Sequence, residues 1–85
     1  MSNDMNNKSQ LRQFILENYL FTDDESQLDD SQSFLSTGIL DSMGILELVA
    51  FLNDDLQVKV ETHEMIPDNL DSIDNLMRFI DNKKS

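Results

Sequence analysis

Residues 41–56 read DSMGILELVAFLNDDL, and this stretch decides the fold class of the chain. Its apolar residues recur at intervals of three and four, which is the period of an amphipathic α-helix. Placing the residues at 100° steps gathers five aliphatic side chains into one stripe that we expect to face a core: Ile45, Leu48, Val49, Leu52 and Leu56. The helix is expected to begin at Asp41 or Ser42, because either side chain can cap free backbone N–H groups.

The opposite face of this helix carries Met43, Glu47, Ala50 and Asp54. A face that mixes apolar side chains with two acids is unusual for a helix that meets only solvent. We therefore interpret it as a docking surface for a partner. The alternative is that these are scattered exposed apolar residues, which are normal on soluble proteins.

Upstream of this helix, four residues at helical spacing predict a first helix over residues 9–20: Leu11, Phe14, Ile15 and Asn18. Residues 21–40 show no helical period and are expected to form a long first loop. Apolar anchors should pin this loop onto the helices, namely Leu28, Phe34, Leu35 and Ile39. We expect residues 1–8 to be a disordered tail and residues 9–85 to form a single domain.

Downstream, a short helical turn is expected over residues 61–66, ending at Pro67. A proline pushes the preceding residue, here Ile66, out of the helical region. A last helix is predicted over residues 72–82, with Asp71 as its N-cap. The chain is therefore expected to be all-α.

Composition excludes several kinds of function. The 85 residues contain no Cys and one His, so a disulfide framework, a thiolate metal site, a thiol nucleophile and a His-rich zinc site are excluded. Seventeen acids against six bases give a net charge of -11, which makes nucleic acid and anionic membranes poor partners. No apolar run is long enough to span a membrane, and the polar first ten residues lack a signal-peptide core. We expect a cytoplasmic protein.

The negative charge is concentrated in one half of the chain. Ten acids and no base occur between Glu17 and Asp55. These acids would steer a partner with a basic patch to this half, and they would repel one another in the compact state. The alternative is that a high net charge only keeps a small protein soluble.

Ser42 is the candidate for chemistry, because it stands at the start of a helix directly after Asp41. A nucleophilic serine would need a base, but His63 is far along the chain and no Gly-x-Ser-x-Gly motif surrounds Ser42. We therefore expect no catalytic residue and no enzyme activity. A phosphodiester on this hydroxyl would instead lie beside the positive end of the helix dipole. Gly44 would leave room for a partner or a prosthetic arm. The alternative is that Asp41 or Ser42 is only a helix cap.

The stretch Asp41-Ser42-Met43-Gly44 is followed by Glu47-Leu48-Val49 and preceded by Phe34-Leu35 and Gly38-Ile39-Leu40. This pattern resembles that of the acyl carrier proteins, including their peptidyl- and D-alanyl-carrier branches. The resemblance covers about residues 11–81. Glycine after Met43 is closer to free-standing aminoacyl, D-alanyl or secondary-metabolite carriers than to the carriers of fatty-acid synthesis.

The resemblance implies a four-helix bundle with a long first loop and a short third helix. It also implies a 4′-phosphopantetheine arm, transferred from coenzyme A to Ser42 by a phosphopantetheinyl transferase, with Asp41 and Met43 flanking the attachment. Acyl or aminoacyl groups of fatty-acid, polyketide or nonribosomal-peptide biosynthesis would be carried as thioesters on this arm. A monomer would then meet loading enzymes and synthases through Met43, Glu47, Ala50 and Asp54. The alternative is an unmodified acidic adaptor of the same fold.

Overall fold

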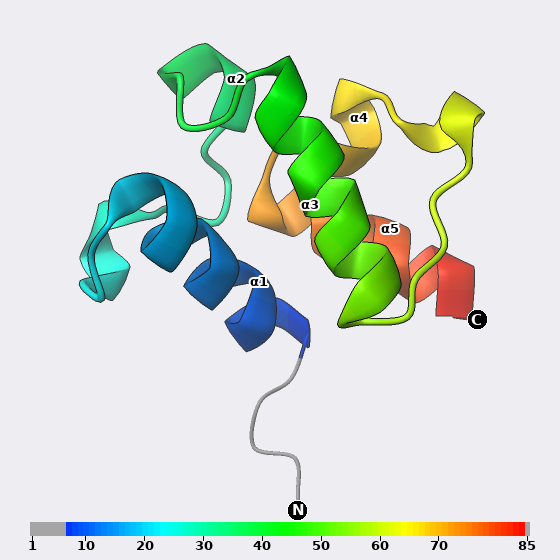
Figure 1. The fold of residues 1–85 in the computed structure, drawn as a ribbon, viewed down its shortest axis with the longest axis horizontal. Helices are drawn as coiled ribbons and strands as arrows, with labels where there is room; N and C mark the ends of the chain where they lie inside the picture. The colour runs from blue at the N-terminus through cyan, green and yellow to red at the C-terminus, as the bar shows by residue number, and fades with distance from the viewer. Residues whose placement is uncertain (1–6, 85) are drawn as a thin grey trace, which may run out of the picture.

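The computed structural model describes residues 7–84, and every regular element within them is helical (Figure 1). The α-helices are α1 (Asn7–Ile15), α2 (Phe34–Thr37), α3 (Ser42–Asp54), α4 (Pro67–Leu70) and α5 (Ile73–Lys84). A π-helical turn, η1 (Leu16–Leu20), continues α1, and two 3₁₀ turns are η2 (Glu25–Gln27) and η3 (Thr62–Glu64). The all-α expectation is confirmed, and the arrangement is compatible with a small helical bundle. None of the described helices is both long and apolar enough to cross a membrane.

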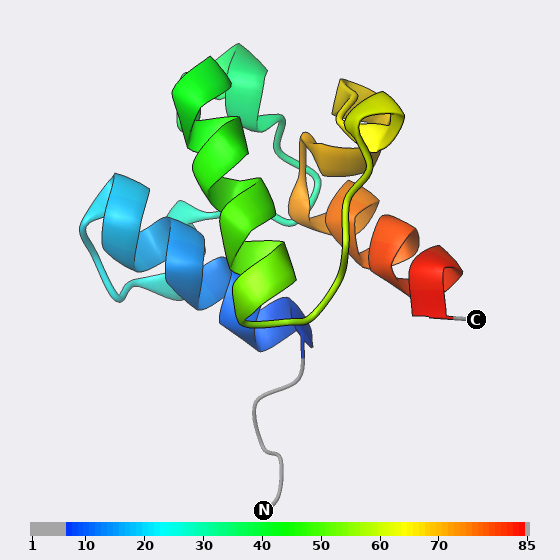
Figure 2. The same cartoon turned by 45° about the vertical axis from the view of Figure 1, so that its right-hand side comes forward.

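In Figures 1 and 2, α3 crosses the middle of the molecule, with α1 to one side and α4 to the other, and α1 also contacts α5 directly. Leu48 and Leu52 of α3 are fully buried and Leu56 is nearly so, whereas Ile45 and Val49 at the edges of the expected stripe are half-buried. Both flanks complete the core with buried side chains: Leu11, Ile15, Leu16, Leu28, Phe34, Leu40, Val58, Leu70, Ile73, Leu76, Phe79 and Ile80.

The first helix differs from the prediction at both ends. It begins at Asn7 rather than at residue 9, and the tail expected over residues 1–8 otherwise lies outside the described residues. From Leu16 the chain follows the wider π turn, which ends at Phe21 in a left-handed conformation with φ 55°. A wider turn changes which residues face inward. Leu16 is therefore buried beside Ile15, and Asn18, predicted on the inner face, is exposed.

The connection over residues 21–40 contains the one-turn helix α2, which the sequence did not predict. The Ser33 hydroxyl oxygen accepts a hydrogen bond from the Ser36 N–H at 3.0 Å and caps this turn. Gly38 ends it with a φ of 77°, a conformation that glycine adopts without steric cost. Leu28 and Phe34 are buried anchors as predicted, but Leu35 is 42% exposed and was wrongly assigned to this role.

Asp71 does not cap the last helix. The Ser72 hydroxyl oxygen accepts from the Asn75 N–H at 3.1 Å and takes that position. The Asp71 carboxylate instead accepts hydrogen bonds from the Leu35 N–H, at 2.9 Å, and from the Ser33 hydroxyl. Asp71 therefore ties the start of α2 to the corner between α4 and α5.

Pro67 begins a helix rather than ending one. It is the first residue of α4, where its missing N–H costs nothing because the first N–H groups of a helix have no partner within the helix. Ile66 before it is extended, with φ −121° and ψ 155°, as the proline requires. The short helical turn predicted over residues 61–66 is present as η3, which ends at Glu64, and α4 is a further helix that the sequence did not predict.

The acids between Glu17 and Asp55 are partly neutralised by cations from α1. Lys8 Nζ lies 2.6 Å from Asp30 Oδ2, and Arg12 lies 2.6 Å from Asp30 Oδ1 and 2.9 Å from Glu25 Oε1. The hydrogen bond from Lys8, supported by Arg12 and opposed by partial burial, holds the pKa of Asp30 below its ordinary value. Mutual repulsion, expected from the local lack of bases, is therefore relieved at these two acids.

Candidate functional site

The start of α3 is held by Asp41. Its backbone is extended, and its Oδ1 accepts a hydrogen bond from the Gly44 N–H at 2.8 Å. Of the two candidates for the cap, Asp41 is therefore the N-cap and Ser42 is the first helical residue. The Ser42 side chain is exposed, and no other residue in the described part of the chain binds its hydroxyl. The serine is thus presented by the helix without being needed to cap it.

The first turn of α3 also leaves backbone donors open. Within residues 7–84, the N–H groups of Ser42 and Met43 have no hydrogen-bond partner, whereas the Ile45 N–H donates to the Asp41 carbonyl oxygen at 3.0 Å. Free N–H groups and the helix dipole make this end of α3 electropositive. An anionic group bonded to the Ser42 hydroxyl would be stabilised there.

Gly44 serves a different purpose from the one expected. It is buried, and a Cβ atom at this position would lie 3.1 Å from Leu40 Cδ2 and 3.3 Å from Leu40 Cβ. The space left by the missing side chain is therefore filled by Leu40. It is not open to a partner or a prosthetic arm, and that expectation was wrong.

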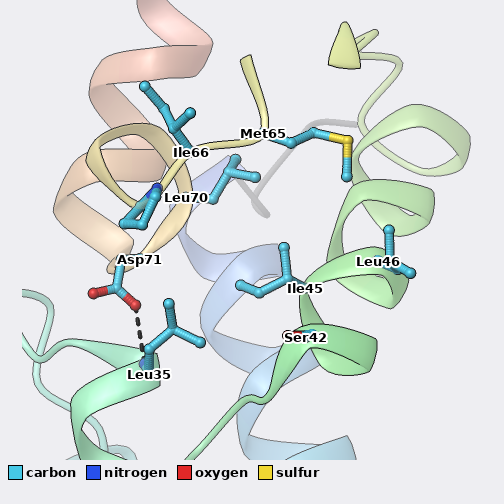
Figure 3. A pocket seen from close by; sticks show the side chains of 9 residues that line it. Leu35, Ser42, Ile45, Leu46, Met65, Ile66, Leu70 and Asp71 are labelled. Carbon is cyan, nitrogen blue, oxygen red and sulfur yellow. Dashed lines mark hydrogen bonds between the residues drawn. The ribbon is translucent and has the colours of Figure 1, made fainter. Parts of the chain in front are cut away.

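Ser42 instead lines an apolar cavity of about 320 Å³ between α3 and α4 (Figure 3). Asp71 and Ser42 are its polar residues, and the remaining lining is apolar: Leu35, Ile45, Leu46, Met65, Ile66, Pro67 and Leu70. In Figure 3 the side chains of Leu35, Ile45 and Leu70 point towards one another. A large apolar group close to Ser42 could bury its surface in this cavity.

Three segments build this cavity: α2 and α3 are neighbours in the sequence, and the chain around α4 follows later. Helix α3 contributes Ser42 and Leu46, the chain around the start of α4 contributes Ile66, and α2 contributes Leu35, whose N–H is held by Asp71. Sequence reasoning missed the cavity. The sequence did offer one signal, because Leu46 and Ile66 are apolar residues that belong to no predicted core stripe. In the structure these side chains are 50% and 44% exposed.

The predicted outer face of α3 is exposed as the helical period requires. Met43 is 65% exposed, and Glu47, Ala50 and Asp54 are also exposed. Sequence reasoning did not include Tyr19 of η1, whose hydroxyl donates a hydrogen bond to Glu47 Oε1. Partial burial, together with this bond and the negative charge of Glu47, raises the pKa of Tyr19 to about 12. Tyr19 therefore orients one of the two acids on this face.

The described residues bring no three His, Cys, Asp or Glu side chains together as a metal site. His63 is exposed in η3 and is not among the residues that line the cavity. Comparison with known proteins gave no matching family model and no matching curated protein. The chemistry of this site therefore rests on its geometry.

Proposed function

We propose that this protein is an acyl carrier that holds a 4′-phosphopantetheine arm on Ser42. The observation that carries the proposal is that Ser42, the first residue of α3, is exposed and borders an apolar cavity, while Asp41 caps the helix. The helical arrangement supports the same reading. The segment α1 with η1, together with α3, α4 and α5, would be the four helices of the bundle, and the long first loop would contain α2.

The residues around Ser42 fit such an arm. The free N–H groups of Ser42 and Met43 suit the negative charge of a phosphodiester, and the cavity suits apolar atoms beyond it. When bound, the arm would supply the thiol for thioester chemistry, which a chain without Cys cannot supply itself. Catalysis would be left to partner enzymes.

Each side chain then has a separate task. Asp41 holds the first turn so that the Ser42 hydroxyl faces solvent, where a phosphopantetheinyl transferase can reach it. The cavity beside Ser42 shelters an apolar cargo, and its almost wholly apolar lining favours an acyl group over a charged aminoacyl group. Met43 is exposed next to the attachment point and would be the first apolar contact of a docked enzyme.

The modification is tested by incubating the chain with coenzyme A, magnesium and a broad-range phosphopantetheinyl transferase. Intact-mass spectrometry is expected to show one added arm, and tandem mass spectrometry should place it on Ser42. Ser42→Ala should remain unmodified and keep its helical circular dichroism, because Asp41 provides the cap. A folded wild-type chain that stays unmodified with several transferases would reject the carrier and favour the unmodified acidic adaptor.

The docking role of the outer α3 face is tested by charge reversal. Glu47→Lys combined with Asp54→Lys should slow modification and flatten its dependence on salt, because surface charges mainly set association rates. Asp23→Lys with Asp29→Lys is the matched control. Both control residues are exposed in the first loop, and neither side chain forms a hydrogen bond or ion pair within the described residues. Equal slowing by both pairs would mean that only net charge is recognised.

A further inference from the structure

A second depression, of about 490 Å³, lies between the first helix and the C-terminal half of α3. It shares no lining residue with the cavity beside Ser42. The half-buried rings of Phe14 and Phe51 line it and stack on each other, with centroids 4.4 Å apart and an angle of 19° between their planes. Each ring covers one face of the other, so a flat group could lie only on the parts of the rings that remain exposed.

The other residues around these rings are polar. Glu17 and Asp55 supply two carboxylates, one from η1 and one from the end of α3. Glu17 Oε2 accepts a hydrogen bond from Gln13 at 2.9 Å, and the Asp55 carboxylate has no partner among residues 7–84. The acceptors on Asp55, and Oε1 on Glu17, therefore remain open to a donor from outside.

None of the residues whose side chains the structure describes places a cation at this depression. No Lys or Arg occurs from Gln13 to Val58. The nearest cation along α1 is Arg12, and its guanidinium is engaged by Glu25 and Asp30. Among the residues that the structure describes, none forms an ion pair with Glu17 or Asp55. The two carboxylates therefore leave this aromatic surface with negative charge that no ion pair among the described residues neutralises.

We propose that this depression binds an arginine side chain presented by a partner protein. The planar guanidinium stacks on the exposed part of the Phe14 and Phe51 rings and donates hydrogen bonds to Glu17 and Asp55. Arginine fits better than lysine, because its flat, delocalised cation can stack on an aromatic ring and contact two acceptors at once. This interaction does not depend on modification of Ser42, so an unmodified chain is sufficient to test it.

The probe is the blocked tripeptide acetyl-Gly-Arg-Gly-amide, titrated into the ¹⁵N-labelled chain. Its control is the same peptide with citrulline, which keeps the shape of arginine and lacks its charge. We expect saturable shifts of the Glu17, Phe51 and Asp55 amide signals with the arginine peptide alone. The amide signals around Ser42 should not move.

Variants then separate the local site from the overall charge. Glu17→Gln and Asp55→Asn should each weaken binding by about two- to fivefold, the usual value of an exposed ion pair. Phe51→Leu should weaken it by a similar factor through loss of the ring. The matched control combines Asp68→Asn with Asp74→Asn, which removes two exposed acids from α4 and α5 and should leave the affinity unchanged.

Three results would overturn the proposal: equal binding of the citrulline peptide, an equal loss of affinity in the Asp68 and Asp74 control, or no saturable shift at the depression. If Phe51→Leu fails to fold, the two carboxylate variants still decide the outcome, because they leave the ring packing intact. A failed arginine titration with successful modification of Ser42 would reject this inference alone. Binding of the arginine peptide without modification of Ser42 would reject only the proposed carrier function.

Discussion

Replacing Gly44 by alanine tests how closely α3 packs against the chain that leads into it. The added Cβ would lie 3.1 Å from Leu40 Cδ2 and 3.3 Å from Leu40 Cβ, which is closer than ordinary van der Waals contact. Leu40 is only 2% exposed, so its side chain has little free space into which it can move. The methyl group must therefore displace a core residue.

Two effects of opposite sign set the size of the change. Alanine is favoured over glycine within a helix by about 1 kcal/mol. Inserting a methyl group into a filled core costs about 1–3 kcal/mol. Since the φ of Gly44 is not positive, alanine introduces no backbone strain to add to this balance. We expect Gly44→Ala to lower the free energy of unfolding by about 1 kcal/mol, within a range of about 0–2 kcal/mol.

The measurement is urea denaturation followed by circular dichroism, in the wild-type background and in Leu40→Val. Valine lacks the Cδ atoms, which removes the 3.1 Å contact and leaves the one to Cβ, so Gly44→Ala should be less destabilising in that background. The resulting coupling between the two positions should be about 1 kcal/mol, as for residues in direct contact. If Gly44→Ala stabilises the wild-type chain by the full helix-propensity difference, the close packing on Leu40 is wrong.

Three further predictions concern the caps and the charges. Asp41→Ala should lower the free energy of unfolding by about 0.5–2 kcal/mol through loss of the bond to Gly44, and Asp41→Asn should keep most of it. Asp71→Ala should lower the free energy of unfolding by about 1–3 kcal/mol, because it leaves the Leu35 N–H without a hydrogen-bond partner. Hydrogen exchange of the Leu35 amide should become faster, and an unchanged rate would contradict the bond between Asp71 and α2. The pKa of Asp30 is lower in the folded chain than its ordinary value of 3.8, so the ionised carboxylate stabilises the fold at pH values above 3.8. This contribution to stability is lost as the pH falls further. Acid titration of Asp30→Asn should therefore show a shallower loss of stability, and parallel curves would argue against the pairs with Lys8 and Arg12.

Residues 41–56 by themselves determined the most about this protein. The helical period is a local property, because each residue turns the helix by a fixed angle whatever surrounds it. It therefore predicted which side of α3 is buried, at Leu48 and Leu52, and which is exposed, at Met43 and Glu47. The sequence could also predict Asp41 as a helix cap, because the hydrogen bond joins residues only three positions apart.

Only the tertiary structure decided what surrounds Ser42. The cavity needs Leu35, Leu46 and Ile66 to meet, and the bond between Asp71 and Leu35 joins residues that no local pattern links. The role of Gly44 likewise depended on where Leu40 packs. The cavity and the bond to Asp71 come from contacts between segments far apart in the chain, and such contacts follow from how the helices pack together and not from the period of any one helix. Leu40 is only four residues before Gly44, but its burial in the core depends on the same packing.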